Sequence, residues 1–351
     1  MQLDGTDSQY SHPTQPVRHS YPLAIQNSDL STAISLLLRT LPYAGARFFV
    51  LFTTSLVTAV WWVISFGGMM FLSAKIHGIA GLLWFLGWAF AYGYLWKTLV
   101  RYFLYLLKAG HIAVLTELIT KDSIGNGNEG MFEYGKRVVS ERFGQMNAMF
   151  ALDLLVAGIV AAFNRTLNWI AGLLPVPGMR DIAGIVNAIV RSATTFIDET
   201  ILSYSLARGD SDAFRSARDG LIYYAQNSKE VLKTGIWIVV LDKVATFFTW
   251  IVMFIPAILI GTILPDSIKG AGILFTAVLS AMFAWAVRGA FLQPLFLTMI
   301  MIKFHVCVKG QPIEPQWDAQ LSQVSGKFVE LKNKIGQTVT GAPSPTPTIA
   351  A

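Results

Sequence analysis

Three charged residues interrupt the most apolar part of the sequence. Asp242 and Lys243 lie within the apolar run 234–263, and Arg288 lies near the middle of the apolar run 270–302. An ionisable side chain inside a bilayer costs about 2.5–3.5 kcal/mol on insertion scales, so such groups usually pair with each other or serve a function. At about 1.5 Å per helical residue, the expected depths of Asp242 and Arg288 differ by about 7 Å. The two residues can therefore form a buried ion pair that fixes a helical hairpin, while Lys243 extends its ammonium group to the membrane surface.

The same charges could instead line a solute path. Asp153, in another apolar run, could join Asp242 and Arg288 in a triad. The two carboxylates would then bind a small cationic solute, with Arg288 as their counter-ion. Three tryptophans could supply cation–π walls around that solute: Trp237, Trp250 and Trp285. From the sequence, both interpretations remain open.

No catalytic or metal-binding motif accompanies these charges. The sequence contains no HExxH, P-loop or GxSxG pattern, its five histidines are scattered, and Cys307 is its only cysteine. We therefore expect neither an enzyme nor a bound cofactor or metal. The neighbouring acids Asp198 and Glu199 would project about 100° apart on a helix, so we do not expect them to act as a carboxylate pair.

Membrane helices are the elements that must position these residues. The 351 residues are 54% apolar and only 14% charged, with a mean hydropathy of +0.52, whereas soluble domains contain about 25% charged residues. A membrane-spanning helix needs about 20 apolar residues. Six runs approach or exceed this length, around residues 47–72, 79–100, 147–174, 182–206, 234–263 and 270–302. The sequence therefore predicts an all-α polytopic membrane protein whose domain 47–310 contains about six transmembrane helices in three hairpins.

The segment 182–206 is the weakest of the six predicted spans. It contains three charged residues, Arg191, Asp198 and Glu199. We therefore leave open that it is a partly buried or interfacial helix.

Amphipathic and polar segments surround the predicted spans. Residues 1–28 form a polar tail, 29–46 an interfacial amphipathic helix, and 337–351 a proline-rich tail without fixed structure. Two amphipathic stretches, around 101–146 and 208–233, are expected on the cytoplasmic side.

The segment 311–336 is predicted to be a cytoplasmic amphipathic helix. Its apolar side chains recur at spacings of 4, 3, 4 and 3 residues, which is typical of one helix face: Trp317, Leu321, Val324, Phe328 and Leu331. This face either docks on the protein's own cytoplasmic side or associates with a second copy to form a homo-oligomer.

The basic residues predict the orientation in the membrane. The net charge is +6, and 20 basic residues fall on one side of the predicted spans against four on the other. Cytoplasmic loops carry this excess, so we expect both termini in the cytoplasm, with the protein in the plasma membrane or, in a prokaryote, the inner membrane. The expected partner is the lipid bilayer and not a nucleic acid.

Two resemblances add to these expectations. The runs Ser216-Ala217-Arg218-Asp219 and Val239-Val240-Leu241-Asp242-Lys243-Val244 resemble the part of choline transporter-like proteins where an amphipathic helix enters a late span. This resemblance covers residues 210–315 and implies a choline-like solute. Residues 112–119 and 196–204 are similar to stretches of a six-span prokaryotic membrane protein family, which implies the six-span fold but no activity.

Two functions follow as hypotheses. The first is a transporter or channel-like protein for a small cationic, choline-like solute, which we favour because three predicted spans carry charge. The second is a non-transporting membrane scaffold or assembly protein that acts through its cytoplasmic helices. Replacing Asp242 by Asn should abolish flux in the first case, whereas disrupting Leu321 and Phe328 should break assembly in the second.

Overall fold

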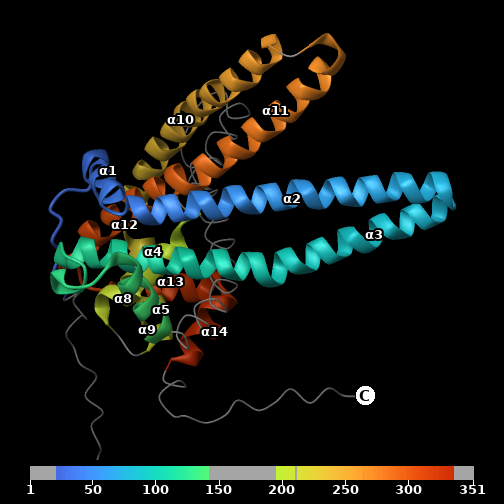
Figure 1. Ribbon diagram of the computed structural model, residues 1–351. Helices are drawn as coiled ribbons and strands as arrows, with labels where there is room; N and C mark the ends of the chain where they lie inside the picture. The colour runs from blue at the N-terminus through green and yellow to red at the C-terminus, as the bar shows by residue number, and fades with distance from the viewer. Residues whose placement is uncertain (1–20, 142–194, 210–211, 264, 336–351) are drawn as a thin grey trace, which may run out of the picture.

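Two long helical hairpins extend from a body of shorter helices (Figure 1). The computed structural model describes residues 21–141, 195–209, 212–263 and 265–335. Every secondary-structure element in these ranges is a helix or a helical turn. One hairpin consists of α2 (Leu41–Lys75) and α3 (Gly78–Leu95), and the other of α10 (Ser228–Ile263) and α11 (Asp266–Val287). The body contains α1 (Leu30–Arg39), α4 (Arg101–Lys121), α5 (Met131–Glu141), α8 (Ile197–Arg208), α9 (Ala213–Gln226), α12 (Gln293–Val308), α13 (Pro315–Val324) and α14 (Gly326–Lys334).

Four helical segments are long and apolar enough to cross a membrane: Leu41–Lys75, Gly78–Lys121, Ser228–Ile255 and Gly272–Val308. The described part of the chain is all-α, and its apolar helices are consistent with an integral membrane protein. The predicted span 147–174 and residues 182–194 of the next one lie outside the described residues, so the six-span arrangement stays a prediction. The structure describes only residues 195–206 of the predicted span 182–206. They belong mainly to α8, whose side chains from Glu199 to Ser205 are buried in the body.

Both hairpins present apolar side chains on their outer surfaces. Only 11% of the most apolar stretch of α2 and 6% of that of α10 is buried, and Phe90 of α3 and Ile263 of α10 are about four-fifths exposed, at 79% and 81%. Within the first hairpin, α2 and α3 approach closely where Gly81 lies, since a Cβ there would stand 2.4 Å from the carbonyl oxygen of Met69. Such helices need an apolar solvent, which a bilayer supplies.

Each hairpin returns to the body through one continuous helix. α3 leads through a π-helical turn, Trp96–Val100, into α4, and α11 leads through a second π-helical turn, Arg288–Leu292, into α12. Beyond these turns the environment changes, because residues 109–120 of α4 are all buried, as are most residues of α12. The expected cytoplasmic amphipathic helix that starts at Arg101 is therefore a core helix. The last third of the predicted span 270–302 is likewise packed in the protein core.

The core of the body forms where α4, α8, α9 and α12 meet. Its largest fully buried side chains include Ile112 of α4, Ile201 and Tyr204 of α8, Tyr223 of α9 and Phe304 of α12. Tyr204 contacts Tyr223 and Phe304 edge to face, with ring centroids 6.0 and 5.9 Å apart. Aromatic pairs favour this arrangement because the positive ring edge meets the negative ring face.

The two hairpins meet where they leave the body. Phe48 and Phe52 of α2 contact Phe283 of α11 edge to face, with ring centroids 4.9 and 5.5 Å apart. Leu51 packs against Ala286 and Ala290 in the same cluster. This apolar contact fixes the base of one hairpin against the base of the other.

The predicted interfacial helix 29–46 is divided in two. α1 ends at Arg39, and Pro42 lies in the first turn of α2, where its missing N–H is not needed. Asp29 caps α1 by accepting a hydrogen bond of 2.8 Å from the Thr32 N–H. Ala33 and Leu36 are buried, and α1 packs on α12, while three apolar side chains remain exposed: Leu30, Ile34 and Leu38.

The predicted helix 311–336 is also divided, and it docks on the body of its own chain. α13 and α14 are separated at Ser325, whose side chain accepts the Phe328 N–H at 3.2 Å. Leu321, Phe328 and Leu331 are at most 4% exposed, and Trp317 packs partly buried against the same core. Val324 is the last residue of α13. The break removes the continuous stripe that a coiled coil with a second copy would need.

Candidate functional site

The expected ion pair is present at the base of the second hairpin. Arg288 donates hydrogen bonds to Asp242 Oδ1 from Nε at 3.1 Å and from Nη2 at 2.9 Å, and Nη2 also lies 3.0 Å from Oδ2. The side chains are 42% and 20% exposed, respectively. The Thr246 hydroxyl adds a longer contact of 3.5 Å to Asp242 Oδ1. The pair joins α10 to the π-helical turn that follows α11.

A groove of about 540 Å³ contains this pair. It is lined by Asp242, Lys243, Thr246, Phe247, Thr249, Trp250, Ala284, Trp285 and Arg288. Two of the three predicted wall residues, Trp250 and Trp285, are therefore part of it. Trp237 is 65% exposed and does not line the groove. Asp153, the predicted third charge, lies outside the described residues.

The pair lies at the body end of the second hairpin. Ile263, the last residue of α10, is 21 residues beyond Asp242, and Asp266, the first residue of α11, is 22 residues before Arg288. At about 1.5 Å per residue these intervals are about 32 and 33 Å, against a hydrocarbon thickness of about 30 Å. A hairpin whose tip reaches one membrane surface therefore places the pair at the other surface.

The apolar run 270–302 extends beyond the hairpin, so the middle of the run is not the middle of the hairpin. Beyond Leu292 the run continues as α12, which is apolar because protein packs around it. Arg288 is central in that run but peripheral in the hairpin. Lys243 is adjacent to Asp242 and exposed, as its expected reach to the membrane surface requires.

The body contains a buried chain of polar side chains that sequence analysis did not single out. Tyr21 Oη lies 2.5 Å from His305 Nδ1, His305 Nε2 lies 2.8 Å from Ser203 Oγ, and Ser203 Oγ lies 2.7 Å from Thr116 Oγ1. The Thr116 hydroxyl also donates to the Ile112 carbonyl at 2.7 Å. The chain connects the N-terminal segment, α12, α8 and α4. The position of His305 inside an apolar stretch could have indicated a buried histidine that needs hydrogen-bond partners.

A second buried polar group lies at the start of α8. Glu199 is 5% exposed and forms an ion pair with Lys108 of α4. Burial alone would raise the pKa of Glu199, but the charge and the hydrogen bond of the Lys108 ammonium hold it below its ordinary value.

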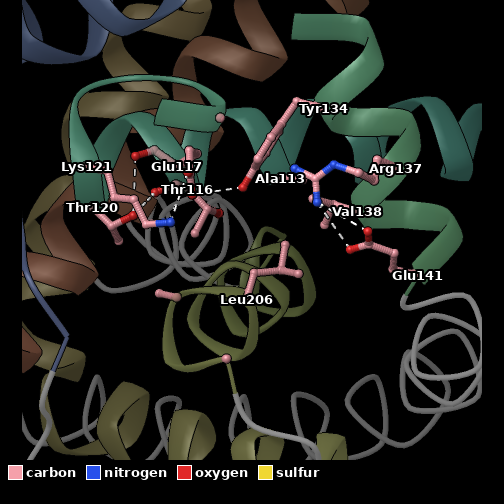
Figure 2. Close-up of a pocket in the computed structure, with 13 residues that line it drawn as sticks. Ala113, Thr116, Glu117, Thr120, Lys121, Tyr134, Arg137, Val138, Glu141 and Leu206 are labelled. Carbon is pink, nitrogen blue, oxygen red and sulfur yellow. Dashed lines mark hydrogen bonds and ion pairs between the residues drawn. The ribbon is translucent and has the colours of Figure 1, made fainter. Parts of the chain in front are cut away.

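A polar cavity of about 390 Å³ lies between α4, α5 and the end of α8 (Figure 2). Glu117 accepts hydrogen bonds from Lys121 at 3.0 Å and from the Tyr134 hydroxyl at 2.8 Å. Burial and this bond to Glu117 raise the pKa of Tyr134. Arg137 is paired with Glu129 at 2.7 Å and with Glu141 at 3.3 Å. The charged groups at this cavity are thus paired with one another. They leave fewer unpaired charges for a ligand than the groove at Arg288 does.

Comparisons of the chain with protein-family models, with curated proteins and with solved structures find no match. Within the described ranges, no group of three His, Cys, Asp or Glu side chains could hold a metal ion. The functional argument therefore rests on the hairpins, the groove at their base and the body.

Proposed function

We propose that this protein is an integral membrane scaffold, in which two hairpins hold a helical body at the cytoplasmic surface of the bilayer. One observation carries the proposal: the hairpins expose apolar side chains over most of their surface and continue without a break into the body. Buried fractions of 11% and 6% for the apolar stretches of α2 and α10 leave these helices suited to contact lipid.

Continuous helices give this arrangement its rigidity. Residues 78–121 form one uninterrupted helical path through the π-helical turn at Trp96–Val100, and residues 266–308 form another through Arg288–Leu292. A helix transmits orientation over its length, whereas a flexible linker does not. The body would therefore keep a fixed orientation relative to the membrane, which is what a scaffold requires.

The distribution of charge supports a cytoplasmic body. The tips of the hairpins carry two basic residues, Lys75 and Lys269, among the described residues. Four others cluster where the hairpins join the body: Lys97, Arg101, Lys243 and Arg288. Basic residues near the ends of spans favour the cytoplasmic side. The membrane would be the plasma membrane or, in a prokaryote, the inner membrane.

Binding of partners would use the outer faces of the body. Leu321, Phe328 and Leu331 are buried against their own chain, so they are not available to recruit another protein. The scaffold role is therefore assigned to the exposed surface of the docked helices and not to the apolar stripe that the sequence suggested.

Cysteine labelling in intact membranes tests the arrangement. In a Cys307→Ser background, Asn128→Cys in the body and His77→Cys at a hairpin tip should react with an impermeant maleimide from opposite sides of the membrane. Met253→Cys, within α10 and ten residues before its end, should be protected from both sides because it faces lipid or a neighbouring helix. Labelling of Asn128→Cys and His77→Cys from the same side would contradict the topology.

Transport of a small cationic solute is the second candidate. The groove that joins Asp242 and Arg288 to Trp250 and Trp285 favours it, because tryptophan faces bind cations. The charges weigh against it, since Arg288 neutralises Asp242 and Lys243 adds a further positive charge. The test is uptake of a choline-like cation by proteoliposomes. Flux that Asp242→Asn abolishes in a folded protein, together with water-accessible labelling of Met253→Cys, would favour transport over the scaffold.

A further inference from the structure

We infer that the groove at the base of the second hairpin binds the phosphate of an anionic phospholipid headgroup. The inference rests on the membrane insertion in the proposed function but not on the scaffold role itself. Four properties of the groove carry it: its free hydrogen-bond donors, its net charge, its depth and its aromatic walls.

Two donor groups in the groove have no partner among the residues that the structure describes. The Arg288 guanidinium employs Nε and Nη2 to bind Asp242, while Nη1 makes no hydrogen bond to any described residue. The Lys243 ammonium is exposed and has no ion-pair partner in the described part of the chain. A guanidinium held by a carboxylate on one edge is oriented before a ligand arrives, so its remaining N–H groups can meet a phosphate oxygen at small entropic cost.

The net charge of the groove selects an anion. Lys243 and Arg288 contribute two positive charges and Asp242 one negative charge, while the other six lining residues are uncharged. The groove therefore carries a net charge of +1, which attracts a phosphate and repels a cation. Arg288 already occupies both oxygens of the carboxylate that a cationic solute would need.

The depth of the groove matches the headgroup region. Asp242 and Arg288 are about 32 and 33 Å from the tip of their hairpin, slightly more than the hydrocarbon thickness of about 30 Å. Lys97 of the first hairpin lies 19 residues after Gly78, or about 29 Å from its own tip. Both hairpins thus carry basic side chains at a distance from their tips that is close to the hydrocarbon thickness, which suits contact with lipid phosphates.

Aromatic side chains complete the site for a lipid. Phe247, Trp250 and Trp285 line the groove beside the charged groups, and they are exposed by 61%, 38% and 47%. Tryptophan favours the membrane interface, where its ring contacts the glycerol and upper acyl regions and its N–H meets water or headgroups. A free phosphate ion would use only the charged end of this groove.

The test is native mass spectrometry of the full-length protein in detergent, titrated with phosphatidylglycerol or with phosphatidylcholine. We expect tighter binding of phosphatidylglycerol, weakened about fivefold by Lys243→Gln, since one basic residue near anionic lipid contributes about 1 kcal/mol. Lys97→Gln is the matched control, because it removes the same charge at a similar depth on the other hairpin. It should change the affinity by less than about twofold. Circular dichroism of each variant checks that the helices remain folded.

Four results would overturn the inference: equal affinity for the two lipids, no effect of Lys243→Gln, an equal effect of Lys97→Gln, or displacement of phosphatidylglycerol by inorganic phosphate at similar concentration. The last result would identify a site for a soluble phosphate compound. None of these results alters the labelling expected from Asn128→Cys, His77→Cys and Met253→Cys, so failure of the lipid site and failure of the membrane topology are distinguishable.

Discussion

The hydroxyl of Tyr21 lies 2.5 Å from Nδ1 of His305, although 284 residues separate them in the sequence. The other ring nitrogen of His305 lies 2.8 Å from Ser203 Oγ, so both nitrogens of a fully buried imidazole have partners. The segment that precedes α1 is thereby fastened to α12 and, through Ser203, to α8. One polar chain links parts of the body that come from both ends of the described chain.

Replacing Tyr21 by Phe should lower the free energy of unfolding by about 1–3 kcal/mol, because it leaves a buried histidine nitrogen without its partner. Denaturant or thermal unfolding in detergent measures the change. Tyr94→Phe is the control, since Tyr94 is 63% exposed on α3. If both variants unfold alike, the Tyr21 hydrogen bond does not stabilise the body.

A double-mutant cycle should show coupling between Asp242 and Arg288. Asp242→Asn and Arg288→Gln each leave one member of the pair without its counter-charge, whereas the double variant removes both charges. We expect the double variant to lose less free energy of unfolding than the sum of the two single losses. The difference, which is the coupling energy, should be about 0.5–3 kcal/mol. Thermal unfolding in detergent, with hydrogen exchange of α10 and α11 as a local measure, gives the coupling. Additive effects would show that the pair does not fix the hairpin.

Docking of α13 and α14 should weaken in acid because of Asp318. Burial alone would raise the pKa of Asp318, but hydrogen bonds and charges from Lys332 and Arg218 hold it below its ordinary value of 3.8. A carboxyl whose folded pKa is lowered stabilises the folded state above its ordinary pKa. That stabilisation is lost as the pH falls through the folded pKa.

The measurement compares pepsin cleavage within residues 315–334 of the unmodified protein and of Asp318→Asn at each pH. At about pH 5 the unmodified protein should be better protected, and the difference should shrink as the pH falls below 3.8 and through the lowered folded pKa of Asp318. Comparing the two proteins at one pH cancels the pH dependence of pepsin itself. A constant difference over this range would contradict the role of the Asp318 charge.

Phe328→Ala should destabilise the body by about 3–5 kcal/mol, because Phe328 is fully buried and its truncation leaves a cavity. Val329→Ala is the control on the next residue, which is 39% exposed and should change stability by less than about 1 kcal/mol. Unfolding curves and size-exclusion chromatography are measured on both variants. A Phe328→Ala variant of unchanged stability that dissociates an oligomer would instead support self-association through this stripe.

The sequence by itself was enough to predict the long apolar helices and the two hairpins that they form. Apolar runs longer than about 20 residues, separated by short turns near 76 and 264, are enough to predict α2 with α3 and α10 with α11. The pairing of Asp242 with Arg288 was also predictable, because both charges sit in one hairpin and an unpaired charge there is costly. These features depend on local composition and on distance along one helix.

Only the tertiary structure decided which apolar segments pack in the protein core. α12 is as apolar as α11, yet α12 is buried by α1, α8 and α10. A helix surrounded by protein and a helix surrounded by lipid both exclude water, so hydropathy along the chain cannot separate them. For this reason sequence analysis did not show that Arg288 lies at the base of the hairpin, treated residues beyond Arg101 as a cytoplasmic amphipathic helix, and overlooked the buried contacts of Glu199 and His305. Those contacts join residues far apart in the sequence, and packing alone brings them together.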